Sequence, residues 1–274
     1  MMLRVSQLFI YPIKSLGGIA LNSARVTDRG LEHDRRWMLV DDNNRFLSQR
    51  ELLQMALFKP MLNKDGISII YTPDQSSFLI PFQPETATCD MFTVWDDSVT
   101  GQYVSEAANG WFTQKLGINC RLVYMPDDSQ RQTDLKYAQP GMITSFADAY
   151  PFLLIGQASL DDLSNRVGHN IPMNRFRPNI VFTGGESFAE DELAHFSINN
   201  IHFYGVKLCA RCPVPGIDQD TAERYKEPLK TLAGFRRRMN KIYFGQNLTH
   251  IGEGMISVGD KMEILKVKET VVFE

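Results

Sequence analysis

The sequence has few cysteines and no long apolar segment. Its 274 residues include four cysteines, Cys89, Cys120, Cys209 and Cys212, and so few do not form the disulfide framework of a secreted protein. The apolar run near the N-terminus is broken by Pro12 and Lys14, and no stretch reaches the roughly 20 apolar residues that span a bilayer. We therefore expect a cytoplasmic protein without a signal peptide and without a membrane partner.

The charges of the chain nearly cancel. The formal net charge is −3 and 22% of the residues are charged, so no global field attracts nucleic acid or anionic lipid. The basic residues Lys230, Arg236, Arg237 and Arg238 lack interleaved aromatic residues and are expected on a solvated helix face. The sequence predicts no nucleic-acid partner, and any anion site must be local.

Several common catalytic motifs are missing. There is no P-loop, no Rossmann glycine pattern and no Gly-x-Ser-x-Gly elbow, which argues against the nucleotide and hydrolase sites that these motifs build. The five histidines are scattered and show no metal-triad spacing: His33, His169, His195, His202 and His250.

The pattern of the first half predicts mostly strands. Apolar and β-branched residues predict a strand over 3–11, and the turn residues 41–44 predict a hairpin between 37–40 and 46–48. Further strands are expected at 67–71, 78–82 and 91–95. A helix is expected over 105–116, with Ser105 as N-cap and Gly117 just past its end. We place a domain boundary after it, giving domains 1–120 and 121–274.

The second half is expected to alternate strands with turns and one helix. Strands are predicted at 121–124, 152–155, 176–182 and 261–265, with a hairpin over 196–204. In the strand 176–182, Arg177 and Asn179 would share a face. A helix is expected from Ser159, as N-cap with Asp162 at N3, to Gly168. The polar segment 126–141 predicts a mobile loop and a candidate lid.

The segment Cys209-Ala210-Arg211-Cys212-Pro213 is the strongest chemical signal. A structural zinc site needs four ligands, and only one cysteine pair is present. A thioredoxin-like pair opens a helix, which the following prolines do not continue. Cys209 fits a small buried residue at a strand end. Beside Arg211, Cys212 favours a thiolate, which either ligates a soft metal or attacks a substrate.

Cations on several loops supply the second signal. Charge-assisted donors that converge from rigid strands suit an anionic group with a polar heterocycle. The residues that we expect to converge in this way are Lys14, Ser15, Arg35, Arg177 and Arg211.

Taken together, several segments resemble the MOSC family, which includes amidoxime-reducing proteins and molybdenum cofactor sulfurases. These segments follow one another along nearly the whole chain: Tyr11-Pro12-Ile13-Lys14-Ser15, Gly30 to Trp37, Ser48 to Glu51, Ser159 to Leu163, Arg175 to Ile180, Cys209 to Cys212, Glu227-Pro228-Leu229 with Leu232, and Phe244-Gly245-Gln246. The resemblance implies an α+β, mostly β fold, with an N-terminal β-barrel-like domain followed by a MOSC β-barrel with a few short helices.

The resemblance also implies a molybdenum cofactor, in which molybdopterin carries the metal. It makes Cys212 the metal ligand and catalytic residue, and places Lys14, Ser15 and Arg35 near the phosphate. The residues implied around the pterin are Asp148, Arg177, Asn179 and Arg211. The sequence departs from the amidoxime-reducing pattern at Ala149, Ala210 and Asn247, which alters the hydrogen bonds expected around the pterin.

The implied activity is reduction of small N-hydroxylated compounds, such as amidoximes and hydroxylamino-purines, to amidines or amines. The chain ends a few residues past its last predicted strand, so a separate electron-donor protein is expected, such as a reductase or a ferredoxin-like or haem protein. Two alternatives stay open. One is a sulfur carrier or sulfurtransferase with a persulfide on Cys212, and the other is a non-catalytic carrier of the molybdenum cofactor.

Overall fold

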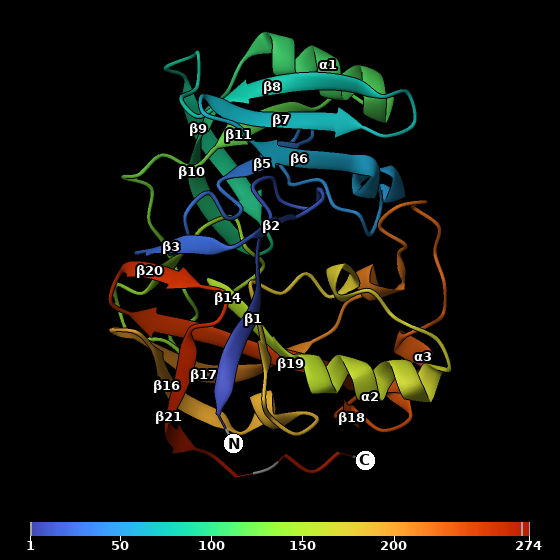
Figure 1. Ribbon diagram of the computed structural model, residues 1–274. Coiled ribbons are helices and arrows are strands. Elements are labelled where there is room, and N and C mark those ends of the chain that lie inside the picture. Colours follow the sequence, from blue (N-terminus) through green and yellow to red (C-terminus); the bar gives the residue numbers. More distant parts are fainter. Residues whose placement is uncertain (1, 270, 274) are drawn as a thin grey trace.

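The structure, a computed structural model, describes residues 2–269 and 271–273. Figure 1 shows the strands β5 to β11 and helix α1 in the upper half, and a barrel flanked by α2 and α3 in the lower half. The fold is mostly β, with three α-helices among the described residues. The predicted fold class is confirmed.

Seven strands close into a barrel in the order β14, β15, β1, β21, β16, β17 and β19. The ring closes because β14 pairs in parallel with β15 on one side and antiparallel with β19 on the other. The bounds of these strands are β1 Leu3–Ile10, β14 Phe152–Gly156, β15 Ile180–Thr183, β16 Leu193–Ile198, β17 Ile201–Ala210, β19 Lys241–Ile251 and β21 Lys261–Val267. Two short strands extend this sheet: β2 (Ile19–Leu21) beside β1 and β18 (Arg237–Arg238) beside β19.

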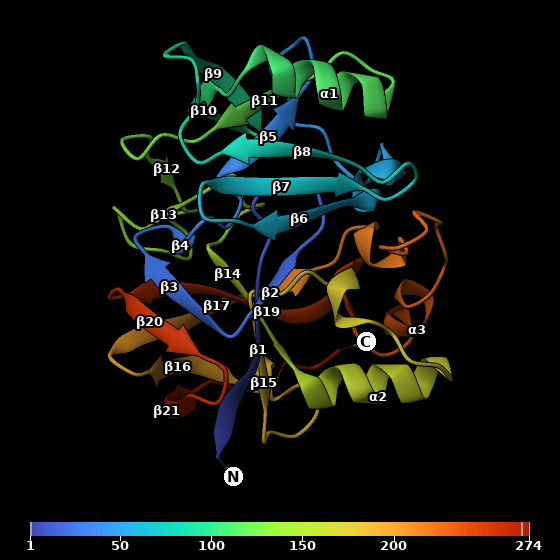
Figure 2. The same cartoon turned by 45° about the horizontal axis from the view of Figure 1, so that its top comes forward.

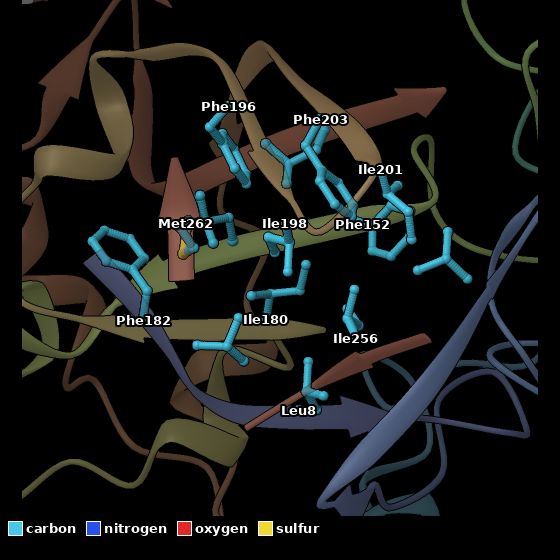
Figure 3. Packing of buried hydrophobic residues seen from close by; sticks show 14 of the residues in the cluster. Leu8, Phe152, Ile180, Phe182, Phe196, Ile198, Ile201, Phe203, Ile256 and Met262 are labelled. Carbon is cyan, nitrogen blue, oxygen red and sulfur yellow. The ribbon is translucent and has the colours of Figure 1, made fainter. Parts of the chain in front are cut away.

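Apolar side chains fill the barrel, since alternate residues of each strand point inward. Figure 3 shows Leu8, Phe152, Ile180 and Phe203 directed toward one interior, and each is at most 1% exposed. The rings of Phe152 and Phe203 meet edge to face, with centroids 5.3 Å apart. Burying each such side chain stabilises the fold by about 1.5–3 kcal/mol.

The first half builds two further sheets. One has the order β5 (Trp37–Val40), β11 (Arg121–Tyr124), β10 (Asp97–Tyr103) and β9 (Cys89–Val94), and the other has the order β6 (Phe58–Leu62), β7 (Gly66–Tyr71) and β8 (Ser76–Pro81). Helix α1 (Glu106–Leu116) begins where Ser105 Oγ accepts a hydrogen bond from the Ala108 amide and ends at Gly117, whose φ is +68°. The predicted helix and both of its caps are confirmed.

Smaller pairings connect distant parts of the chain (Figure 2). They join β12 (Arg131–Gln132) to β13 (Ile143–Thr144), and β20 (Gly254–Ser257) to β3 (Ser23–Thr27) and β4 (Gly30–Leu31). Short 3₁₀ helices cover Leu53–Leu57, Met173–Arg175, Ala189–Asp191 and Val214–Gly216. The division of the chain at residue 120 stays a prediction.

Helix α2 spans Gln157–Val167 and begins earlier than predicted. Its N-cap is Gly156, which has no capping side chain. Ser159 lies inside the helix because its hydroxyl is used elsewhere: it donates to Glu190 Oε2 at 2.7 Å and accepts from the Phe188 amide at 2.7 Å. The predicted cap at Ser159 was wrong, whereas Gly168 ends the helix as expected, with a φ of +87°.

Two expectations about arginines were also wrong. The strand predicted over 176–182 begins only at Ile180, because Arg177 has a φ of +57° and turns the chain before the strand. Arg236 does not lie on a solvated helix face: helix α3 (Leu229–Ala233) ends before it, and its buried guanidinium pairs with Asp191 at 2.6 Å.

The segment 126–141 is partly built into the fold. Its strand β12 pairs with β13, and the side-chain amide Nε2 of Gln132 donates to the backbone carbonyls of Gln139 and Met142. Its role as a lid stays a prediction. Within the described part of the chain, no helix combines the length and apolarity needed to cross a bilayer.

Candidate cofactor pocket

Tyr11, the residue after strand β1, is the centre of a cluster of cations. Its ring contacts the guanidinium groups of Arg35, whose central carbon lies 4.4 Å from the ring centroid, and of Arg177, at 4.2 Å. Tyr11 is 1% exposed, and burial raises the pKa of its hydroxyl to about 12 although both arginines act to lower it. The ring therefore attracts both guanidinium groups by cation–π interaction.

Arg35 connects the first half of the chain to the barrel. It donates to Asp34 Oδ2 at 2.6 Å, to Asn179 Oδ1 at 3.1 Å and to the Arg177 carbonyl at 3.3 Å. The other oxygen of Asp34 accepts the Tyr11 amide at 2.8 Å. These bonds hold the guanidinium in one orientation, which suits the binding of a planar or anionic group.

Arg177 lies against the loop that carries Lys14 and Ser15. It donates to the Leu16 carbonyl at 2.6 Å, and burial lowers the pKa of its guanidinium to about 10. Three of the predicted ligands have left-handed backbones, with φ values of +68° for Ser15, +50° for Arg35 and +57° for Arg177. Each costs of the order of 1–2 kcal/mol, and such conformations concentrate at functional sites.

The cysteine motif leaves strand β17, which ends at Ala210. Arg211 donates to Cys209 Sγ at 3.2 Å and to the Phe176 carbonyl at 2.8 Å. Burial raises the pKa of the Cys209 thiol, against the charge of Arg211. Cys209 and Cys212 are both free, partly exposed thiols. Among the described residues, Cys209 Sγ accepts from Arg211 whereas Cys212 has no hydrogen-bond partner, so Cys212 is the thiol that is available to a ligand.

Lys14 and Asp148 form a pair at the same pocket. The Lys14 ammonium is 4% exposed and donates to the Phe146 carbonyl at 2.9 Å and to Asp148 Oδ1 at 2.5 Å. Burial lowers the pKa of Lys14 to about 8, partly offset by Asp148. The protein around Asp148 raises the pKa of its carboxyl, but Lys14, Arg35 and Trp95 together lower it by more, so the pKa lies below its usual range. Asp148 remains a carboxylate.

The structure brings most of the predicted residues together. Arg35, Arg177 and Asn179 are connected by hydrogen bonds, and the charge of Asp148 acts on both arginines and on Cys209. Ser15 lies in the same loop as Lys14, but within the described residues its hydroxyl has no hydrogen bond to the other predicted ligands. The ligand roles of these residues stay predictions.

Sequence reasoning missed Tyr11 and Asp34 as members of the site. Both lie in segments that carry the MOSC resemblance, Tyr11 to Ser15 and Gly30 to Trp37, but neither was given a role there. The residue types alone do not show their roles, which arise from the packing of Arg35 and Arg177 against the Tyr11 ring.

Two buried atoms of the pocket lack partners within the described chain. They are Tyr11 Oη and Arg211 Nε, and both are able to donate. A cavity of about 190 Å³ is lined by Tyr11 and, among the predicted ligands, by Arg177 alone, and there Gly18 leaves room for the ring, since a Cβ would lie 2.5 Å from Tyr11 Cε1. A larger cavity, of about 440 Å³, is lined by none of the predicted ligands. The donor-rich pocket fits an acceptor-rich, anionic group.

Comparison with known proteins decides the family. Residues 2–119 match the MOSC N-terminal beta barrel domain and residues 142–263 match the MOSC domain. This chain belongs to the MOSC family. Within residues 2–269 and 271–273, no three His, Cys, Asp or Glu side chains are grouped so as to hold a metal ion.

Two kinds of relative share both MOSC parts. Mitochondrial amidoxime-reducing component 1 from Mus musculus is 31% identical, over 95% of this chain and 82% of the relative. The protein of the same name from Homo sapiens is 30% identical over the same shares. Molybdenum cofactor sulfurase from Danio rerio is 30% identical over 90% of this chain. The MOSC chain spans about a third of that sulfurase, with 32% covered.

Proposed function

We propose that this MOSC protein binds a molybdenum cofactor, with the Cys212 thiolate as the protein's ligand to the metal, and reduces N-hydroxylated compounds. The observation that carries the proposal is the partly exposed Cys212 thiol directly after Arg211, whose Nε, like the nearby Tyr11 Oη, is a buried donor without a partner among the described residues. Relatives named amidoxime-reducing components, similar over 95% of the chain, support the reaction class.

The pocket offers separate groups for the two ends of such a cofactor. Arg177, Asn179 and Arg211 present guanidinium and amide groups to a pterin ring, which carries both donors and acceptors. Lys14, Ser15 and Arg35 would hold the phosphate, because charge-assisted donors favour an oxyanion. A single thiolate suffices from the protein, because the cofactor brings two dithiolene sulfurs of its own.

When bound, the cofactor supplies two-electron chemistry with gain or loss of an oxo group. In the overall reaction an amidoxime, two electrons and two protons give an amidine and water, with the N–O bond broken. The electrons come from a separate donor protein. The resemblance places Asp148 beside the pterin, but its side chain is 68% exposed and is held as a carboxylate by Lys14, so we assign it a hydrogen bond from the N–H or O–H of the substrate instead. We place the reaction in the cytoplasm.

The test compares metal binding by two cysteine variants. The protein, purified from a host that makes the cofactor, is assayed for molybdenum and pterin beside Cys212→Ser and Cys209→Ser. We expect stoichiometric metal in the wild type, loss or altered ligation in Cys212→Ser, and little change in Cys209→Ser. Turnover of an amidoxime panel with an added reductase system tests the reaction. Equal metal content with the same ligation in all three proteins would refute the role of Cys212.

A sulfur-carrier function is the second candidate, favoured by the likeness to a relative named molybdenum cofactor sulfurase. In that case Cys212 holds a persulfide and passes its outer sulfur to an acceptor. Mass spectrometry of the metal-free protein distinguishes the two functions, because a persulfide that is lost in Cys212→Ser supports the carrier. Stoichiometric cofactor without turnover of any substrate would instead indicate a non-catalytic cofactor carrier.

A further inference from the structure

Trp95 reaches the pocket from a hairpin in the first half of the chain. It lies in the turn between β9 and β10, and its indole Nε1 donates to Asp148 Oδ1 at 3.2 Å. Its side chain is 40% exposed, whereas Trp37 is buried and Trp111 partly buried. The hairpin therefore places an accessible aromatic ring beside the carboxylate of the pocket.

The backbone at Trp95 is unfavourable for a large side chain. Val94 and Asp97 are paired across the hairpin, so Trp95 and Asp96 form a two-residue turn. The first turn residue, Trp95, has a φ of +59°, and Asp96 has no positive φ. Glycine is the residue that such a first position favours. Tryptophan adopts this backbone conformation at a cost in free energy, which contacts of its side chain must offset.

The surroundings of Trp95 form an aromatic and cationic rim. The Arg50 guanidinium lies 4.0 Å from the ring centroid of Trp95, and Phe46 packs against the same indole at 5.2 Å. The Lys14 ammonium lies 4.8 Å from the centroid of Phe46. These contacts fix the ring while leaving part of its surface exposed.

Only one oxygen of the Asp148 carboxylate beside this ring accepts hydrogen bonds from the described residues. Its Oδ1 accepts both Lys14 and Trp95, while among the described residues Oδ2 has no hydrogen-bond partner. Its side chain is 68% exposed. A ligand lying on Trp95 thus meets a free carboxylate oxygen at its edge, which suits a flat molecule with N–H or O–H groups on one side.

We propose that Trp95 and Asp148 form the substrate-recognition wall of this protein, on which planar N-hydroxylated compounds stack while donating to Asp148 Oδ2. The proposal rests on the proposed function and narrows its substrate class to flat, conjugated compounds such as aromatic amidoximes. Aliphatic amidoximes offer the same donors but no ring to stack. Trp95 therefore sets the preference between the two classes.

The experiment compares Trp95→Gly, Trp95→Phe and the control Trp111→Phe, whose indole packs on Phe58 and Phe78 away from Asp148. Glycine suits the positive φ, so Trp95→Gly is expected to fold. We expect its KM for benzamidoxime to rise about five- to tenfold, as for the loss of one aromatic contact. The KM for acetamidoxime should stay within about twofold in the same variant. Trp95→Phe should lie between wild type and Trp95→Gly, and the control should match wild type.

A binding measurement separates this inference from the proposed function. Calorimetric titration with benzamidine, the product of benzamidoxime reduction, needs no turnover. We expect its Kd to rise about five- to tenfold in Trp95→Gly and to stay unchanged in Trp111→Phe. No binding by the wild type, or an equal Kd in Trp95→Gly, would overturn the inference. An equal rise in KM for planar and aliphatic substrates would also overturn the inference. In that case Trp95 would only position Asp148 and would not stack on the substrate.

Discussion

The substitution Tyr11→Phe tests whether the buried hydroxyl of the Tyr11 ring is reserved for a ligand. Tyr11 Oη is buried and has no partner among the described residues. An unsatisfied buried hydroxyl costs about 1–3 kcal/mol, and its removal returns part of that free energy. The ring, which carries the contacts to Arg35 and Arg177, is retained in Tyr11→Phe. The cofactor-free variant should therefore be more stable by about 1 kcal/mol.

The magnitude follows from the size of the chain. Unfolding entropy is about 2.1 cal/mol/K per residue, so for 274 residues a gain of about 1 kcal/mol raises Tm by about 2 °C. In the cofactor-loaded protein the hydroxyl gains a partner, and losing that hydrogen bond costs about 1 kcal/mol. The variant should then release the cofactor about fivefold more readily. Stability and cofactor retention are expected to change in opposite directions.

The assay pairs differential scanning calorimetry of the cofactor-free protein with the pterin retained after dialysis of the loaded protein. Tyr150→Phe is the matched control, since Tyr150 Oη is also buried without a partner in the described chain, and its ring packs on Tyr137 instead of the arginines. The control should gain stability and keep its cofactor. If Tyr11→Phe loses stability in the cofactor-free form, the hydroxyl has a partner already and the reasoning fails.

Three further predictions concern charged groups. Burial, reinforced by Asp191, raises the pKa of Glu190 from 4.5 to about 7. Between these values the folded state binds a proton that the unfolded state releases, so the free energy of unfolding should fall by about 3 kcal/mol as pH rises through the interval. Urea titrations at several pH values should show a flatter dependence of stability on pH in Glu190→Gln. Asp191→Ala leaves the buried Arg236 guanidinium without its ion-pair partner, so the free energy of unfolding should fall by about 3–5 kcal/mol in the same assay. A loss below about 1 kcal/mol would show that the pair is solvated. Lys14, with a pKa of about 8, loses its charge as pH rises through that value, so pterin retention should decline there in the wild type and stay level in Lys14→Arg.

Local patterns predicted the elements that depend on local chemistry. Helix α1 carries its start and stop signals, Ser105 and Gly117, within its own sequence, so its bounds followed directly. Ser159 carried an equally good start signal, but the buried Glu190 uses its hydroxyl. That competition comes from a residue 31 positions away, which no local pattern contains.

The site was predictable as a set of residue types but not as a geometry. Arg35 and Arg177 were expected to converge, and they do so around Tyr11, with Asn179 accepting from Arg35. The alternation expected for Arg177 was wrong because of its left-handed backbone. Trp95 was invisible in the sequence because its contact with Asp148 joins a hairpin turn to a distant loop.

The position of β1 in the barrel has a consequence for how the protein is made. This strand pairs with β15 on one side and on the other with β21, at Lys261–Val267, which is synthesised much later. The barrel therefore cannot close until β21 has been synthesised, and until then the edges beside β1 are open to pairing with other chains. A fragment that lacks residues 1–10 would keep those edges open permanently, and a synthetic peptide of that sequence should bind it and restore the barrel.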